Sequence, residues 1–155
     1  MKSPAFTLIE VLIAISIVAL ILGFGFAGFR EYSQRQVLFA VARDVKSDLR
    51  SLQQKALSAE KPAACAGKFL DGYRFDIVSA ARYNISALCS GVGVNIEDKS
   101  LDSGFTISAT IDPILFKVLG QGTNIPSGSS SVITLSQTAI SKSITISVSA
   151  EGSMK

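Results

Sequence analysis

The sequence predicts an α+β protein in which one long N-terminal helix packs on a C-terminal antiparallel sheet. Three observations predict this fold class. Residues 6–29 form an almost uninterrupted apolar run, residues 37–56 carry an apolar stripe at helical spacing, and residues 67–150 contain short segments in which apolar and polar residues alternate. The change of period from helical to alternating separates the helix from the sheet.

The composition suits one globular domain with an N-terminal segment of different character. The chain has 155 residues and a net charge of +3, and its basic residues are scattered, which argues against a dedicated nucleic-acid domain. It has no histidine, the residue most often used as a general base and as a metal ligand. We therefore expect no enzyme activity, no cofactor and no metal site.

The apolar run is long enough to cross a bilayer. Residues 6–29 carry a single charge, Glu10, and about 20 apolar residues span the roughly 30 Å of hydrocarbon. The segment before the run, residues 1–5, contains one positive charge at Lys2 and ends on the small residue Ala5. Two interpretations fit this pattern: cleavage after Ala5, or an uncut signal anchor that Lys2 orients with its N-terminus in the cytoplasm.

The helical pattern continues beyond the apolar run. Its second half, residues 30–60, is amphipathic, and Pro62 ends it because the residue before a proline disfavours helix. We therefore predict one helix over residues 6–59, roughly 80 Å long. The apolar stripe consists of Val37, Val41, Val45, Leu49, Leu52 and Ala56.

Three glycines, Gly23, Gly25 and Gly28, lie where the two halves of the predicted helix meet. Each lowers helix stability by about 1 kcal/mol relative to alanine. They fit close packing of helices in a membrane, where small residues let backbones approach, and they also fit a segment that melts. The two interpretations are compatible.

The rest of the chain predicts an antiparallel sheet over residues 67–150. Tyr73, Phe75 and Ile77 alternate with their neighbours as in a half-buried strand. The strands follow one another without an intervening helix, which favours antiparallel pairing, and the stripe on the helix is expected to cover their apolar face. Further strands are predicted at residues 81–88, 105–111, 114–119, 132–135 and 143–149, with a loop at residues 120–131.

The two cysteines, Cys65 and Cys89, both follow the apolar run. If this part of the chain is exported, an even number of cysteines in an oxidising compartment predicts one disulfide. In the chain-entropy model this bond would stabilise the domain by about 3 to 4 kcal/mol.

Residues 6–14, Phe-Thr-Leu-Ile-Glu-Val-Leu-Ile-Ala, closely resemble the N-terminal motif of type IV pilins and pseudopilins. The resemblance implies that a prepilin peptidase removes residues 1–5 by cutting between Ala5 and Phe6, and then methylates the amino terminus of Phe6. The family usually has glycine at the position of Ala5. The resemblance also implies a pilin-like fold, with residues 6–29 as the transmembrane or fibre-core half of the helix and residues 30–155 as the exported domain.

The end of the chain, residues 144–154, resembles more weakly the closing strand and glycine turn of the H-type pseudopilin and FimT-like group. Some members of that group bind DNA through arginines near the C-terminus. The tail of this chain, residues 152–155, contains no arginine, so we do not carry that activity over.

Glu10 has a physical explanation within the same resemblance. An ionised carboxylate in hydrocarbon is costly unless it is paired or reaches water. Cutting before Phe6 creates a positive amine one helical turn away, and the resemblance implies that Glu10 of one subunit pairs with the amino terminus of its neighbour. The alternative is that Glu10 reaches the nearby interface and is favoured there by the helix dipole.

These observations predict a structural subunit of a type IV pilus-like filament or of a type II secretion pseudopilus, and we expect a minor subunit. The expected partners are a prepilin peptidase, other pilin or pseudopilin subunits, and an inner-membrane assembly platform. The chain would cross the inner membrane once before assembly and then form part of a filament in the periplasm or at the cell surface.

Two other function classes remain open at this stage. One is a minor pilin that acts as a DNA- or surface-binding module in uptake or adhesion. The other, a membrane-tethered enzyme, is disfavoured by the absence of histidine and of any convincing nucleophile. Cations available for DNA are Lys68, Arg74, Arg82, Lys99, Lys117 and Lys142.

Overall fold

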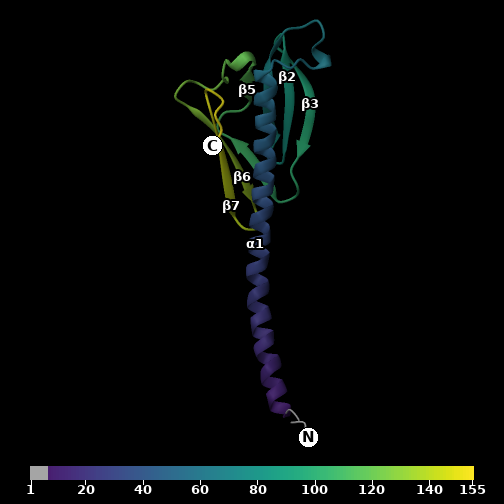
Figure 1. The fold of residues 1–155 in the computed structure, drawn as a ribbon, viewed down its shortest axis with the longest axis vertical. Coiled ribbons are helices and arrows are strands. Elements are labelled where there is room, and N and C mark those ends of the chain that lie inside the picture. The colour runs from purple at the N-terminus through teal and green to yellow at the C-terminus, as the bar shows by residue number, and fades with distance from the viewer. Residues whose placement is uncertain (1–6) are drawn as a thin grey trace.

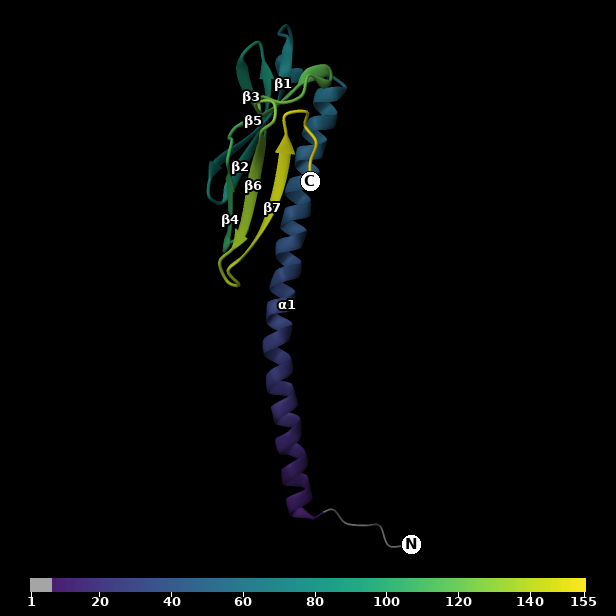
Figure 2. The same cartoon turned by 90° about the vertical axis from the view of Figure 1, so that its left-hand side faces the viewer.

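The computed structural model describes the backbone of residues 7–155, and the side chains of residues 7–23 and 29–155. Helix α1 covers Leu8–Leu57, a length of 50 residues, and extends far beyond the strands that pack on its C-terminal half (Figure 1). A view turned by a quarter shows the strands on one side of the helix only (Figure 2). The predicted α+β class, a long N-terminal helix followed by antiparallel strands, is confirmed.

The two ends of α1 are defined by local hydrogen bonds. Thr7 is the N-cap residue, and Phe6, the predicted first residue, lies outside the described part of the chain. The helix ends two residues before the predicted position, at Leu57. Ser58 follows as the C-cap, donating its N–H to the carbonyls of Gln54 and Ala56, and the next residue has a positive φ that cannot continue a helix.

The strands form two sheets instead of the single sheet that the sequence predicted. Sheet A contains β1 (Leu70–Ser79), β2 (Arg82–Cys89), β3 (Val92–Ser100) and β5 (Ile114–Lys117) in the order β3-β2-β1-β5. Sheet B contains β4 (Phe105–Ala109), β6 (Ser130–Gln137) and β7 (Lys142–Ser149) in the order β4-β6-β7. All neighbours are antiparallel. Short 3-10 helices lie at Ala63–Cys65 and Val118–Gly120.

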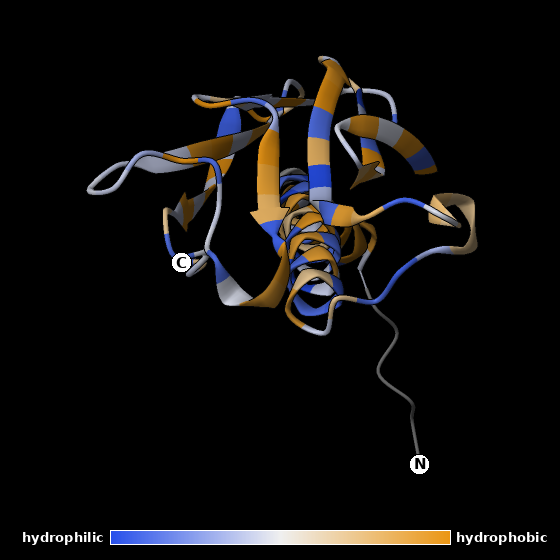
Figure 3. Ribbon diagram, turned by 90° about the horizontal axis from the view of Figure 1, so that it is seen from above, coloured by the Kyte–Doolittle hydropathy of each residue, from blue (hydrophilic) through white to orange (hydrophobic). Residues whose placement is uncertain are grey.

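The helix and both sheets share one core. Seen from above, the strands curve around one side of α1 (Figure 3). Phe75 and Tyr83 lie in this core with their ring centroids 4.9 Å apart. The helical residues that are buried against the sheets are Leu38, Ala42, Val45, Leu49, Leu52 and Ala56.

The predicted stripe is therefore correct in its C-terminal part and wrong at its start. Val37 is 43% exposed, whereas Leu38 is buried. The reason is geometric. On a helix of 3.6 residues per turn each step of four residues rotates the stripe by about 40°, so Val37 lies roughly 80° from Val45, while Leu38 lies only about 20° away.

Strand β3 was not predicted. It is an edge strand of sheet A, and in its span from Val92 to Ser100 only Val94 and Lys99 are even half-buried. A strand with so little buried surface has no clear alternation of apolar and polar residues, which is the pattern that identifies a strand in a sequence.

The C-terminal residues return along the free edge of sheet B. The Lys155 N–H donates to the Ser147 carbonyl at 3.0 Å, and the Ser147 N–H donates to the Lys155 carbonyl at 3.1 Å. The turn at Gly152, which has a φ of +86°, is joined to the helix because Gln53 Nε2 donates to its carbonyl at 3.1 Å. This segment therefore covers part of an edge that would otherwise be open.

Candidate functional site

The first turn of α1 brings Thr7 and Glu10 together. The Glu10 N–H donates to Thr7 Oγ1 at 3.4 Å and to the Thr7 carbonyl at 3.1 Å. A threonine followed three residues later by a glutamate has the spacing of a capping box. The Glu10 carboxylate also lies where the positive end of the helix dipole favours a negative charge. Glu10 therefore has a local role in starting the helix, whatever else it contacts.

Glu10 is surrounded by exposed apolar side chains. All the described side chains from residue 8 to residue 23 are exposed, and Leu8 is 84% exposed. The sequence contains no lysine or arginine between Lys2 and Arg30, and Arg30 is roughly 30 Å from Glu10 along the helix. A cation that pairs with Glu10 must therefore come from the amino-terminal residues or from another molecule.

The predicted cleavage site precedes this turn. Ala5 and Phe6 lie outside the described residues, so cleavage between them and methylation of Phe6 stay predictions. Within the part of the chain that the structure describes, no helix has both the length and the hydropathy that a membrane span requires.

Exposed aromatic side chains continue the apolar surface of α1 beyond its first half. Phe29, Tyr32 and Phe39 are 67%, 61% and 51% exposed. Phe29 lies on the side of the helix opposite the buried stripe, and Tyr32 and Phe39 lie within about 80° of Phe29 around the helix axis. Large exposed apolar patches of this kind are typical of surfaces that contact other molecules.

The C-terminal half of α1 is joined to sheet A by a polar cluster. Tyr83 Oη donates to Asp48 Oδ2 at 2.7 Å, and Lys99 Nζ donates to Asp48 Oδ1 at 3.2 Å. Burial, followed by the hydrogen bond to Asp48, raises the pKa of the Tyr83 phenol. Burial lowers the pKa of Lys99, but its hydrogen bond to Asp48 and the negative charges of Asp48 and Glu97 together outweigh this effect and raise the pKa. Each oxygen of Asp48 thus has one donor, as in a structural contact between helix and sheet.

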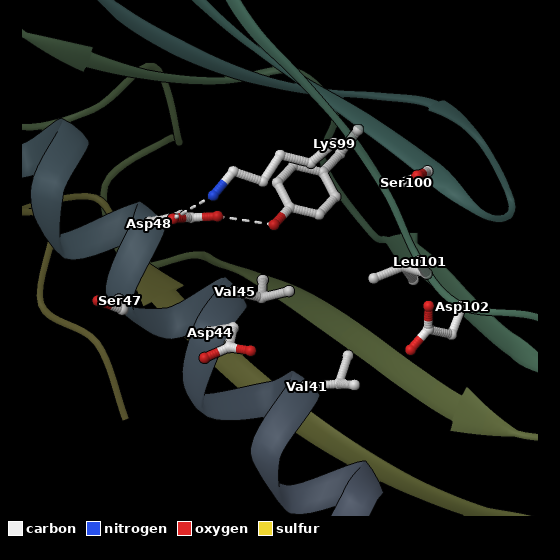
Figure 4. Close-up of a pocket in the computed structure, with 10 residues that line it drawn as sticks. Val41, Asp44, Val45, Ser47, Asp48, Lys99, Ser100, Leu101 and Asp102 are labelled. Carbon is white, nitrogen blue, oxygen red and sulfur yellow. Dashed lines mark hydrogen bonds and ion pairs between the residues drawn. The ribbon is translucent and has the colours of Figure 1, made fainter.

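A cleft lies beside this cluster. It has a volume of about 310 Å³, and Asp44 on α1 faces Asp102, which follows β3, across it (Figure 4). Asp48 and Lys99 lie on its wall (Figure 4). The sequence analysis did not identify this cleft, because its residues come from segments far apart in the chain and no local pattern links them.

Cys65 and Cys89 form a disulfide, with their Cα atoms 5.8 Å apart. Both residues are fully buried. The bond joins the segment after α1 to the end of β2, so it fixes the connection between the helix and sheet A at the end of the domain that lies furthest from the N-terminus.

The six cations considered for DNA do not share one face. Lys99 is bound to Asp48 in the cleft, and Arg74 pairs with Asp76 at 3.2 Å on the opposite face of sheet A. Lys142 belongs to sheet B. Among the described residues, no group of three or more histidine, cysteine, aspartate or glutamate side chains is placed to hold a metal ion.

Comparison with known families identifies the N-terminal segment. Residues 1–26 match the family model described as the prokaryotic N-terminal methylation motif. The comparisons with curated proteins and with solved structures found no match. The motif is the signature of type IV pilins and pseudopilins, so the resemblance noted in residues 6–14 is confirmed. The motif supports a type IV pilin-like or pseudopilin-like precursor, and it implies peptidase processing, a membrane-anchored stage and assembly into filaments.

Proposed function

We propose that this chain is a minor pilin or pseudopilin, a structural subunit of a type IV pilus-like filament or of a type II secretion pseudopilus. One observation carries the proposal: the described side chains of residues 8–23 are exposed on every side of the helix, and Glu10 is their only charge. Such a surface is unfavourable in water and needs lipid or other helices around it. The matched methylation motif covers the same segment.

The proposed sequence of events begins in the inner membrane. Residues 6–29 anchor the precursor there, a prepilin peptidase cuts between Ala5 and Phe6, and the amino group of Phe6 is methylated. An assembly platform then moves the subunit out of the bilayer so that its helix packs among the helices of other subunits. The sheets stay on the outside of the filament, in the periplasm or at the cell surface.

Glu10 gives this assembly its direction and register. Lipid chains are as apolar as leucine side chains, so the transfer of residues 6–29 from lipid to a helical bundle gains little from apolar burial alone. An ion pair in such surroundings does favour assembly, because a carboxylate left unpaired in an apolar environment is costly. The carboxylate of Glu10 therefore pairs with the amino terminus of Phe6 in a neighbouring subunit, and this pair fixes the stagger between the helices.

A substitution test separates pairing from helix capping. The bonds to Thr7 are donated by the main-chain N–H of residue 10, and glutamine also suits position N3 of a capping box, so Glu10→Gln keeps the start of the helix and removes the charge. We expect Glu10→Gln to be processed to an amino terminus at methylated Phe6 and to be at least about tenfold depleted from sheared filaments, because a charge pair worth more than about 1.4 kcal/mol is lost. Mass spectrometry of membranes and filaments measures both quantities.

Two controls accompany this experiment. Glu10→Asp keeps the charge and should retain part of the incorporation. Asp44→Asn removes an exposed carboxylate from the same helix, where it forms no ion pair among the described residues, and should assemble normally. Filaments that contain Glu10→Gln at the wild-type level would refute the pairing, and a wild-type chain that keeps Met1 and never enters filaments would refute the proposed function.

A further inference from the structure

The end of the sheets nearest the N-terminal half of α1 forms a distinct surface, which we call the basal rim. It consists of Arg30 and Arg35 on the helix, Ala139 and Ile140 in the turn between β6 and β7, and Lys142 at the start of β7. In both side views this turn is the part of the sheets that lies lowest along the helix (Figures 1 and 2).

The turn is fixed against the helix. Gln137, which is only 4% exposed, donates its side-chain N–H to the Gln34 side-chain oxygen. The N–H of the next residue, Thr138, donates to the Gly104 carbonyl at 3.0 Å. Ala139 and Ile140 are therefore held beside one helical turn of α1, and the rim has a fixed structure.

Two grooves open at the rim. One has a volume of about 430 Å³ and lies between Arg30, Glu31 and Gln34 on the helix and the turn residues Ala139 and Ile140. The other, of about 200 Å³, is lined by Arg35, Leu38, Phe39, Lys142, Ser143 and Ile144. The first groove has one basic group, Arg30, and the second has two, Arg35 and Lys142; both also have apolar walls, a combination that suits a phosphate attached to an acyl chain.

The rim carries an excess of positive charge. Its three cations face one carboxylate, Glu31, which pairs with Arg35 at 2.5 Å. In the part of the chain that the structure describes, Arg30 and Lys142 form no ion pair. Two cations are thus available to an anionic partner.

The position of the rim along the helix identifies the partner. Arg30 directly follows the apolar run, and Arg35 is about 7.5 Å further along the axis. The headgroup layer on each side of a bilayer is roughly 5 to 8 Å thick. When residues 6–29 lie in hydrocarbon, the cations of the rim therefore lie at the depth of the phosphates. Phe29 and Tyr32, both exposed, lie at the same boundary, where aromatic side chains are enriched.

We propose that the basal rim binds anionic phospholipid headgroups of the membrane in which the precursor is anchored. This inference rests on the proposed function, because it assumes the membrane-anchored stage. The bound lipids hold the domain against the bilayer surface with the turn between β6 and β7 in the interface. Extraction of the subunit into a filament then requires these contacts to break, so anionic lipid opposes premature extraction.

The test uses the full chain in nanodiscs. Ala139, an exposed rim residue, is changed to cysteine and labelled with a nitroxide, and its accessibility to a water-soluble relaxation agent is compared in two lipid compositions. One contains phosphatidylcholine alone and the other also contains phosphatidylglycerol. We expect the anionic discs to protect the label, and Arg30→Gln with Lys142→Gln to weaken docking by about fivefold per charge removed. High salt should expose the label again.

A matched control removes the same charge elsewhere. Arg50→Gln with Lys68→Gln changes two exposed cations remote from the rim and should leave the label protected. Equal accessibility in the two compositions, or equal effects of the two double variants, would overturn the inference. If the label were protected only in nanodiscs that hold two copies of the chain, the rim would be a contact between subunits. This result would also overturn the inference. Failure of the chain to insert into either disc would instead refute the membrane-anchored stage of the proposed function.

Discussion

The two halves of α1 are continuous in backbone and opposite in surroundings. Leu12 in the first half is 59% exposed, whereas Leu49 in the second half is completely buried. Both belong to one helix of 50 residues. Helix formation is therefore common to both halves, and the sheets cover only one of them.

This difference shows which half is complete within the chain. In the second half, buried residues recur at alternating steps of four and three, and the sheets supply the opposite side of the core. In the first half the apolar side chains surround the helix, so no single face can satisfy them. A helix that is apolar on every side belongs in lipid or among other helices, where its backbone hydrogen bonds are satisfied internally.

The same substitution in the two halves should give the largest contrast. Leu49→Ala is expected to lower the free energy of unfolding of the domain by about 2 to 5 kcal/mol, because it leaves a cavity in the core. Leu12→Ala should change it by less than about 0.5 kcal/mol. Urea unfolding of the full chain in detergent, followed by tyrosine fluorescence, measures both values. Equal losses would show that the first half also contributes to the domain's stability.

Much of this contrast could be predicted from the sequence. The apolar run, the amphipathic half and the alternating strands all depend on local periodicity, and they gave the correct fold class. Val37 was assigned to the wrong side because a stripe with steps of four drifts around the helix. Strand β3 escaped detection because an exposed edge strand needs no apolar alternation.

Contacts between distant segments could not be predicted from local patterns. Asp48 bonds to Tyr83 and Lys99, which are 35 and 51 residues away, and these bonds depend on the register between β2 and β3 and on their placement against the helix. The bond from Gln137 to Gln34, which spans 103 residues, places the basal rim in the same way. The motif identified Glu10, whereas only the structure showed that its main-chain N–H donates to the side chain of the N-cap Thr7.

The Asp48 cluster gives a second, intermediate contrast. Tyr83→Phe removes a hydrogen bond to a charged group and should lower the free energy of unfolding by about 1.5 to 3 kcal/mol. Tyr32→Phe alters an exposed tyrosine on α1 and should change it by less than about 0.5 kcal/mol. The same denaturant titration compares the two, and equal effects would mean that the cluster does not join helix and sheet.

The cluster also predicts alkaline sensitivity. The folded state raises the pKa of the Tyr83 phenol above its ordinary value of 10.0, so the neutral form is favoured in the fold. Its contribution to stability is therefore complete below about pH 10 and is lost as the pH rises further. Lys99, whose pKa is also raised, acts in the same direction. The free energy of unfolding of the wild type, measured by urea titration at a series of pH values, should fall steeply above about pH 10. Tyr83→Phe should make this dependence on pH less steep.

The smallest expected effect on the isolated chain concerns the junction of the two halves. An alanine Cβ at Gly23 would meet no atom within 4 Å, so Gly23→Ala should strengthen the helix by about 0.5 to 1 kcal/mol and leave unfolding of the domain unchanged. We nevertheless expect its incorporation into filaments to fall, because helices that approach closely at a glycine have no room for the added methyl group. Quantitative mass spectrometry of sheared filaments measures this loss.

Gly23→Ser distinguishes close packing from a segment that melts. Serine adds similar bulk but strengthens a helix only about half as much as alanine does relative to glycine. Close packing predicts that both variants lose incorporation to the same degree. If incorporation instead follows helix stability, with alanine worse than serine, the junction melts during assembly and the two halves of α1 become separate helices in the filament. If both variants entered filaments at the wild-type level, Gly23 would serve neither close packing nor melting. The helix would then remain continuous in the filament.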